Sequence, residues 1–358
     1  MKTIGIIGGG QLGMFLAIAA YQMGYETLVY DCKDDCCAKN VATKFFLGSF
    51  SDEQRLREFC QSCDVITYEF ENIDSDLLAR LSKIYPLVQK AHPLILSSSR
   101  FNERIMAQKL NIPQPSWQLV SNENDLSKLT LAYPYLLKSD TLGYDGKGQF
   151  LINKKDDLKK VSFDKVSYLA ENKIAFDYEM SVIGVRSITE EFITYEPFYN
   201  IHYHGILNIT LINQDIEQSI VLQAKNIVKK IMMEHNIYGL LCCEFFVKGK
   251  ELFFNEIACR PHNSGHITMD THYTSQYENH IRALLGLKLG NPDIKTGGYL
   301  VNVLGQDVEK TKEFIKENGF DCKYYDYHKE AKYNRKVGHL VVFNDKYLTD
   351  FKKNWKKE

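Results

Sequence analysis

The first strand-and-loop segment constrains the fold more than any other part of this 358-residue sequence. The β-branched run Thr3–Ile7 leads directly into the glycine motif Gly8-x-Gly10-x-x-Gly13. From Gln11 to Met23, apolar residues recur at helical spacing, so the glycines stand between a strand and a helix. Glycines at such a junction allow a tight turn and close packing of helix on strand. We therefore expect a βαβ unit here.

Strand and helix patterns continue to alternate through about residue 98. Thr27–Tyr30 and Val65–Tyr68 are predicted strands, and Asp52–Cys60 is a predicted helix. This order indicates a parallel sheet with helices on both faces. Beyond it, strands and glycines become denser, and a long helix is expected near 214–235. With roughly 150 residues per domain, we predict an N-terminal Rossmann-like domain (1–98), a central domain (99–296) and a small C-terminal domain (297–358).

Composition excludes several broad classes of function. The 44 basic and 45 acidic residues nearly cancel, so the chain has no global attraction to nucleic acid or to anionic membranes. Apolar runs stay well short of the roughly 20 residues that span a bilayer. The apolar start is interrupted at Gly8, unlike a secretory signal. We expect a cytoplasmic protein with reduced thiols. Cys60 and Cys63 have CxxC spacing but lie among predicted strands and helices, so small buried side chains are favoured over a zinc or redox site.

The glycine motif has a functional interpretation of its own. With Asp31 at the end of the second strand, it matches the dinucleotide-binding fingerprint. Alone, it would suggest an NAD-dependent dehydrogenase, although the physics requires only some anion near the helix N-terminus. That interpretation would leave the motifs described next without a role.

A second glycine-rich loop, Gly143–Gln149, lies between the predicted strands Tyr135–Lys138 and Gln149–Asn153. It is not a P-loop, because neither Ser or Thr nor a helix follows its lysine. A mobile loop between strands can instead close over a triphosphate, with Lys138 reaching a phosphate as a point charge. The plainer alternative is a β-hairpin with a glycine-rich turn.

Two glutamates are predicted to face each other. Glu244 and Glu256 lie on strands joined by a short turn, at comparable distances from it. Paired carboxylates are unfavourable without a cation between them, and Mg²⁺ bound together with substrate phosphates suits this arrangement. Apolar neighbours make the alternative, an exposed edge hairpin, less favoured.

The segment Arg260-Pro261-His262-Asn263-Ser264-Gly265-His266 concentrates polar side chains on an irregular path. It suits binding of a small oxyanion and a polar substrate, with a solvated loop as the alternative. Near the end of the chain, Lys329, Lys332, Arg335 and Lys336 form either a phosphate-binding patch or a basic surface turn.

Together these motifs resemble the ATP-grasp enzymes, and among them the N5-carboxyaminoimidazole ribonucleotide synthase family of purine biosynthesis. Their order along the chain carries the resemblance, and the segment His262–His266 after Asn255-Glu256 is its most discriminating part. The matching segments are Gly8–Gly13, Tyr68-Glu69-Phe70-Glu71-Asn72-Ile73, Gly143–Gln149, Asn255–Ala258, Arg260–His266, Ser275–Glu278 and Arg335–His339.

The resemblance implies an ATP-grasp fold and a carbon–nitrogen ligase. ATP would phosphorylate bicarbonate to carboxyphosphate, and the amine of 5-aminoimidazole ribonucleotide would capture the carboxyl group, leaving ADP and phosphate. Mg²⁺ would be the metal, and the chain would form a homodimer with no nucleic-acid or membrane partner.

The resemblance also implies residue roles. Glu171 and its neighbours would receive adenine, and Glu179 the ribose hydroxyls. Glu244 and Glu256 would hold Mg²⁺. The ATP-binding residues would be Arg100, Lys138, Gly143, Tyr144, Asp145, Gly146, Lys147, Gly148, Gln149, Glu171, Asn172, Lys173, Ile174, Glu179, His202, Asn255 and Glu256. Tyr144, Lys147, Arg260, His262 and Asn263 would face the aminoimidazole and bicarbonate. Gln11, Leu12, Lys329 and Arg335 would surround the nucleotide 5′-phosphate, so the first glycine loop would bind substrate phosphate rather than NAD.

Several positions depart from the family pattern. Arg104 replaces the usual lysine, Leu142 a glycine and Cys259 a proline. These changes affect expectations for loop geometry and phosphate contacts rather than for the core assignment. The alternatives are another ATP-grasp ligase acting on a related purine intermediate, the NAD-dependent dehydrogenase, and a binding module without catalysis.

Overall fold

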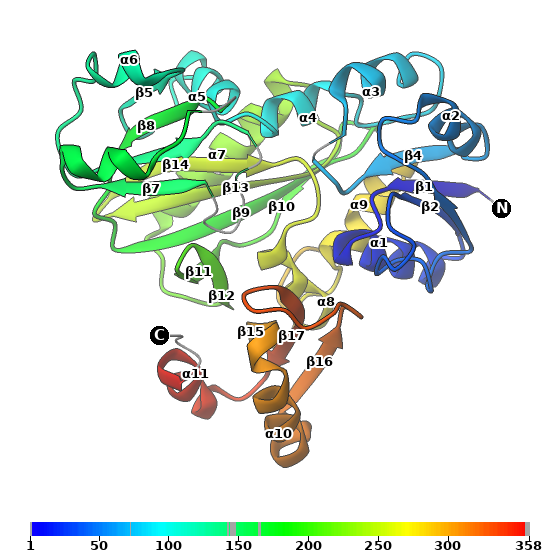
Figure 1. Cartoon of the computed structure of the whole chain (residues 1–358). Coiled ribbons are helices and arrows are strands. Elements are labelled where there is room, and N and C mark those ends of the chain that lie inside the picture. Colours follow the sequence, from blue (N-terminus) through cyan, green and yellow to red (C-terminus); the bar gives the residue numbers. More distant parts are fainter. Residues whose placement is uncertain (1, 72, 142, 144–147, 164–165, 355–358) are drawn as a thin grey trace.

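The computed structural model describes residues 2–71, 73–141, 143, 148–163 and 166–354 (Figure 1). The described strands form three sheets. In Figure 1 the blue N-terminal elements and the green central elements make two upper lobes, and the orange and red C-terminal elements lie below them.

The N-terminal sheet is parallel, in the order β3-β2-β1-β4. Alternate residues of β1 point to opposite faces, so Ile4 and Ile6 pack against α1 while Ile7 packs with α2 and α3. Three of these strands were predicted, but β3 was missed because it is short and its Phe46 alone is fully buried. The elements are β1 (Thr3–Ile7), α1 (Gln11–Gln22), β2 (Glu26–Asp31), β3 (Lys44–Leu47), α2 (Glu53–Gln61), β4 (Val65–Tyr68), α3 (Ser75–Leu81) and α4 (His92–Ser97).

A smaller antiparallel sheet follows, in the order β5-β8-β6-β7. It contains the predicted hairpin strands on either side of the second glycine loop. Of that loop, Gly143, Gly148 and Gln149 are described, whereas Leu142 and the predicted site residues Tyr144, Asp145, Gly146 and Lys147 lie outside the described residues. The elements are α5 (Arg100–Lys109), β5 (Trp117–Val120), α6 (Glu123–Leu126), β6 (Tyr135–Ser139), β7 (Gln149–Ile152) and β8 (Tyr168–Asn172).

The largest sheet runs β14-β13-β9-β11-β12-β15-β17-β16, with β10 paired to β9. The predicted long helix is α7, and its apolar residues, including Val228 and Ile231, pack on one face of this sheet. Strands of the C-terminal segment extend the sheet rather than forming one of their own. The elements are β9 (Tyr178–Arg186), β10 (Phe192–Thr194), β11 (Phe198–Tyr203), β12 (Ile206–Leu211), α7 (Gln218–Glu234), β13 (Gly239–Lys248), β14 (Glu251–Ala258), α8 (Thr268–Thr271), α9 (Gln276–Leu285), β15 (Tyr299–Leu304), α10 (Val308–Asn318), β16 (Cys322–Asp326), β17 (Lys336–Val342) and α11 (Leu348–Asn354).

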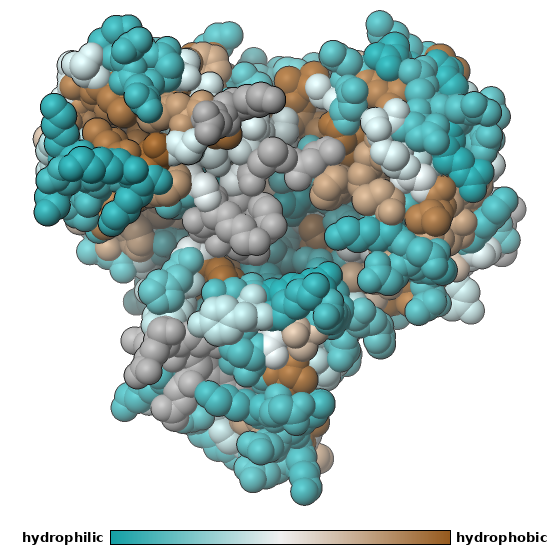
Figure 2. All heavy atoms as spheres, in the orientation of Figure 1, coloured by the Kyte–Doolittle hydropathy of each residue, from teal (hydrophilic) through white to brown (hydrophobic). Residues whose placement is uncertain are grey.

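On the face drawn in Figure 2, hydrophobic and hydrophilic residues are interspersed. Among the described residues, none of the helices is both long enough and apolar enough to cross a bilayer.

Candidate active site

The paired glutamates meet as predicted. Glu244 on β13 is in register with Glu256 on β14, and a β-bulge beside them makes Asn255 an extra residue on β14. Asn255 Nδ2 lies 3.4 Å from Glu244 Oε2, so the bulge turns this amide toward the carboxylates. The side chain of Glu244 is 13% exposed and that of Glu256 is 37% exposed. Carboxylate oxygens gathered in this way fit a hard cation such as Mg²⁺.

Each carboxylate also has a cationic partner. Arg100 Nη1 lies 2.8 Å from Glu256 Oε2, and His262 Nε2 lies 3.1 Å from Glu244 Oε1. Burial would lower the pKa of His262, but Cys242 and Glu244 beside the imidazole raise it to about 10. Burial would raise the pKa of Glu244, but His262 lowers it. The His262–Glu244 pair is therefore ionised at neutral pH.

The small sheet and helix α5 together form a buried three-residue ion cluster. Glu171 on β8 accepts from Arg104 Nε at 2.7 Å and lies 2.8 Å from Lys138 Nζ, and all three side chains are at most 4% exposed. Lys138 also lies 3.4 Å from Asn255 Oδ1 on the large sheet. Lys138 thus links the two sheets beside the carboxylates. Burial lowers its pKa, although Glu171 opposes the shift.

The remaining predicted ATP residues are distributed around this cluster. Glu179 on β9 and His202 on β11 form an ion pair. Burial would lower the pKa of His202, but Glu179 raises it. Asn172 ends β8, and it is followed by exposed Lys173 and half-buried Ile174. All of these residues lie on the two sheets or at their ends.

The segment after β14 joins the three parts of the chain. Arg260 Nε lies 3.0 Å from Glu71 Oε1, just beyond β4 of the N-terminal sheet. Gln11 Nε2 donates to Asn263 Oδ1 at 3.4 Å, and Lys329 Nζ donates to Gln11 Oε1 at 2.6 Å. Three of the predicted substrate residues therefore come together at the start of α1.

The same region is basic. Burial lowers the pKa of Lys329, and the nearby charges of Arg335 and Lys336 act in the same direction. Half-buried Arg335 donates to the backbone carbonyl of Glu330 at 3.3 Å. Leu12 lies on α1 with its side chain in the core and 4% exposed, so it can offer a ligand only its backbone. An anion bound here would offset the burial and the neighbouring positive charges that lower the pKa of Lys329, so the region favours anion binding.

The first glycine loop has a different character from the one expected. The backbone amide of Gly9 donates to Asp31 Oδ2 and that of Gly10 to Glu69 Oε1, each at 2.6 Å. These two amides are thus already bonded to carboxylates of the chain. Asp31 is likewise engaged rather than free for a ribose hydroxyl, which argues against the NAD interpretation.

Three acidic residues at this site were given no role from the sequence, although the segment Tyr68–Ile73, which contains two of them, was among those that carry the resemblance. Glu69 and Glu71 directly follow β4 at the carboxyl edge of the parallel sheet, which is where α/β proteins bind ligands. Their position after a strand was a usable signal. Glu103 accepts from the backbone amide of Ile257 at 2.9 Å, and burial, then Glu256, raises its pKa to about 8. Its location on a helix gave no such signal.

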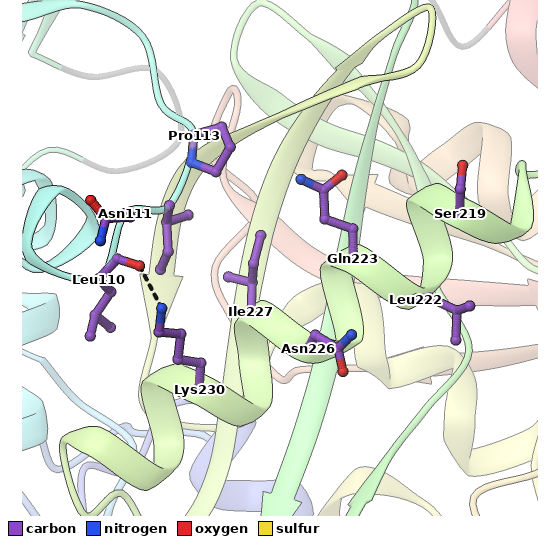
Figure 3. Close-up of a pocket in the computed structure, with 10 residues that line it drawn as sticks. Leu110, Asn111, Pro113, Ser219, Leu222, Gln223, Asn226, Ile227 and Lys230 are labelled. Carbon is purple, nitrogen blue, oxygen red and sulfur yellow. Dashed lines mark hydrogen bonds between the residues drawn. The ribbon is translucent and has the colours of Figure 1, made fainter.

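Other candidate sites carry less chemistry. Cys60 and Cys63 are buried, as favoured from the sequence, and among the described residues no three His, Cys, Asp or Glu side chains group around a possible metal position. A separate hollow between α7 and the α5–β5 connection includes Leu222 and Ile227, with Lys230 donating to the carbonyl of Leu110 (Figure 3). None of the predicted site residues lines this hollow.

Comparisons with known families match this arrangement along most of the chain. Residues 105–277 match the ATP-grasp domain model, and residues 1–97 match the ribonucleotide synthetase preATP-grasp domain. Residues 299–349 match the phosphoribosylaminoimidazole carboxylase C-terminal domain. The chain is thus an ATP-grasp ligase.

Individual relatives narrow the class. The chain is 36% identical to the N5-carboxyaminoimidazole ribonucleotide synthase of Bacillus subtilis strain 168, over 99% of this chain and 95% of that protein. The Staphylococcus aureus N5-carboxyaminoimidazole synthetase complexed with ADP is similar with a TM-score of 0.94 and 34% identity, over 100% and 97% of the two chains. The Aspergillus clavatus synthase in complex with ADP and 5-aminoimidazole ribonucleotide has a TM-score of 0.89 and 25% identity, over 98% and 97%. The chain belongs to the N5-carboxyaminoimidazole ribonucleotide synthase family.

Proposed function

We propose that this chain uses ATP and bicarbonate to carboxylate the amine of 5-aminoimidazole ribonucleotide in purine biosynthesis. The observation that carries the proposal is the meeting of two half-sites. The first half-site, the phosphate end, consists of Glu244, Glu256 and Lys138, where we place the cation and the phosphates of ATP. The second half-site, the polar end, lies beside it and includes Asn263 and Lys329. Residue His262, bonded to Glu244, connects the two ends.

At the phosphate end, the chain supplies charge and position. We propose that Lys138 and Arg100 contact the phosphates and that Glu179 and His202 hold the ribose. Mg²⁺ held by Glu244 and Glu256 would supply positive charge that offsets the charge of the transferring phosphoryl group. Arg100 donates a hydrogen bond to Glu256. In the complex with ATP, a phosphate would replace this carboxylate as the partner of Arg100.

At the polar end, Arg260, His262 and Asn263 would orient bicarbonate against the γ-phosphate. The bicarbonate oxygen attacks phosphorus, ADP leaves, and the amine of the nucleotide then takes the carboxyl group from carboxyphosphate while phosphate departs. Carboxyphosphate hydrolyses readily, so water must be excluded. Closure of the loop Gly143–Gln149, with Tyr144 and Lys147, remains our prediction for how this occurs.

The nucleotide phosphate would contact Lys329, Arg335 and the side chain of Gln11. The amides of Gly9 and Gly10 are occupied by carboxylates, so side-chain charge rather than the glycine loop supplies the contact. We further propose the three domains 1–98, 99–296 and 297–358 and a cytoplasmic location, from the sequence pattern, and a homodimer, from the family resemblance.

ADP release from the purified protein with MgATP tests this function. We expect strong stimulation by 5-aminoimidazole ribonucleotide, lost when bicarbonate is omitted. Stimulation that persists without bicarbonate would instead support a ligase acting on another purine intermediate. An absence of stimulation in a protein that binds ATP would reject the proposed acceptor.

A further inference from the structure

A chain of hydrogen bonds runs from the C-terminal segment to the core through the proposed substrate site. Lys329 Nζ contacts Gln11 Oε1 at 2.6 Å, and Gln11 Nε2 contacts Asn263 Oδ1 at 3.4 Å. His266 Nε2 lies 3.2 Å from the same Asn263 Oδ1, and its Nδ1 lies 2.6 Å from the hydroxyl of Tyr277. The inner members, His266 and Tyr277, are at most 1% exposed.

The lysine fixes the direction of every bond in this chain. An ammonium group only donates, so Gln11 must face it with its carbonyl oxygen and face Asn263 with its amino group. Asn263 must then accept with Oδ1, which requires His266 to carry its proton on Nε2. The bare Nδ1 of His266 accepts from Tyr277. Burial lowers the pKa of His266 well below its usual value, which agrees with a neutral ring.

These bonds also fix the orientation of the amino group of the Asn263 side-chain amide. Because Oδ1 already accepts two hydrogen bonds, the Nδ2 amino group points away from this chain of hydrogen bonds. No acceptor for it lies within hydrogen-bond distance in the described part of the molecule. Asn263 is half-buried, and its Nδ2 is not among the buried side-chain atoms that lack a partner, so this donor is accessible to a ligand. This donor needs an acceptor, which the N–H groups of the substrate amine do not provide and an oxygen of bicarbonate or of carboxyphosphate does.

We propose that Tyr277 and His266 are positioning residues that hold the Asn263 amino group toward the bicarbonate-derived oxygens, an inference that rests on the proposed function. Neither residue touches substrate. Tyr277 fixes the tautomer of His266, and His266 fixes the orientation of the Asn263 amide.

The variant Tyr277→Phe tests this role because it removes one hydroxyl and keeps the ring that packs on Phe15 and His266. Tyr327→Phe is a matched control. The Tyr327 hydroxyl lies 2.8 Å from Nδ1 of His339, whose ring stacks on His266 but takes no part in the chain of hydrogen bonds. We expect Tyr277→Phe to raise KM for bicarbonate roughly tenfold, as for loss of one hydrogen bond. In Tyr277→Phe, KM for ATP should change less than twofold. In Tyr327→Phe, KM for bicarbonate and KM for ATP should each change less than twofold.

Two further measurements separate positioning from folding and from the proposed function. Imidazole ¹⁵N spectra of the protein without substrates should show His266 protonated on Nε2 in the unsubstituted chain and in Tyr327→Phe, and a mixture of tautomers in Tyr277→Phe. In His266→Gln, whose amide can donate in place of Nε2, adding Tyr277→Phe should raise KM for bicarbonate less than twofold further. Equal effects of the two tyrosine variants, or a His266 protonated on Nδ1, would overturn the proposal. Failure of the unsubstituted protein to turn over bicarbonate would instead reject the proposed function, with the ¹⁵N result still standing.

Discussion

The glycine loop after β1 and the hairpin β13–β14 make opposite use of their sequences. The loop carries a well-known anion-binding motif, yet its Gly9 and Gly10 amides are bonded to carboxylates within the chain. The hairpin carries no short motif, yet its register brings Glu244 and Glu256 together. A motif therefore reports a local backbone shape, whereas pairing across a sheet decides which side chains can act together.

The loop's glycines are needed for packing. A Cβ at Gly13 would come within 2.4 Å of the Gly8 carbonyl oxygen, and one at Gly10 within 2.8 Å of Glu69 Oε1. Substitution there should affect folding and the position of Glu69, whereas substitution in the hairpin should affect chemistry. The following experiments, from the largest expected effect to the smallest, test that division.

Glu256→Ala should lower ATP turnover by at least roughly 10²–10³-fold, because it removes a charge that we place beside the transferring phosphoryl group. Glu251→Gln, on the exposed end of the same strand, is the control and should leave turnover unchanged. Steady-state ADP release measures both. Comparable activities in the two variants would remove the hairpin from the active site.

Gly13→Ala should lower the free energy of unfolding by about 1–3 kcal/mol, because the backbone oxygen that it meets cannot move aside. Gly297→Ala, where a Cβ meets nothing within 4 Å, is the control and should be neutral or slightly stabilising. Urea unfolding followed by circular dichroism measures the difference. A stable Gly13→Ala protein would contradict the packing role of the loop.

Lys329→Met should raise KM for 5-aminoimidazole ribonucleotide about tenfold or more, because it removes a charged contact to phosphate. KM for ATP should not change. Lys332→Met removes an exposed lysine that pairs with Glu330, and it should change neither constant. If both variants affected the nucleotide equally, the phosphate site would have to be a diffuse basic surface.

His280 on α9 contacts the N-terminal sheet, since its Nε2 lies 2.9 Å from the Thr67 hydroxyl on β4. Burial lowers its pKa to about 3, so the folded protein keeps it neutral while the unfolded chain takes up a proton below about pH 6.5. Stability from this group is therefore lost as pH falls, by about 1.4 kcal/mol per pH unit between pH 6 and pH 5. In His280→Gln, urea unfolding at these two pH values should show a pH dependence smaller by that amount. Identical dependences would show that His280 is not buried and neutral.

Much of this fold could be predicted from sequence. Periodicity located β1, α1 and α7, and counting from the turn paired Glu244 with Glu256. The short strand β3 was missed because a single buried residue gives no periodic signal. Periodicity also gave no indication that the C-terminal strands extend the central sheet, since strand partners far apart in the chain leave no local pattern.

The site was predictable where chemistry follows a strand end and unpredictable where it depends on long-range contacts. The family resemblance placed Gln11, Asn263 and Lys329 near substrate, and the structure brings these three together. It did not indicate that Arg104 and Lys138 share Glu171, because those contacts join a helix to two strands. Direction along the hydrogen-bond chain likewise emerges only when all of its members are in place.

Transfer of oxygen from bicarbonate to phosphate tests the central claim most directly. The protein would be supplied with MgATP, 5-aminoimidazole ribonucleotide and ¹⁸O-labelled bicarbonate, and the released phosphate analysed by mass. If bicarbonate attacks the γ-phosphate, each phosphate formed carries one labelled oxygen. The contrary result would be unlabelled phosphate in a reaction that does form the carboxylated nucleotide. It would mean that carboxyphosphate is not the intermediate and that the paired glutamates serve a different phosphoryl acceptor.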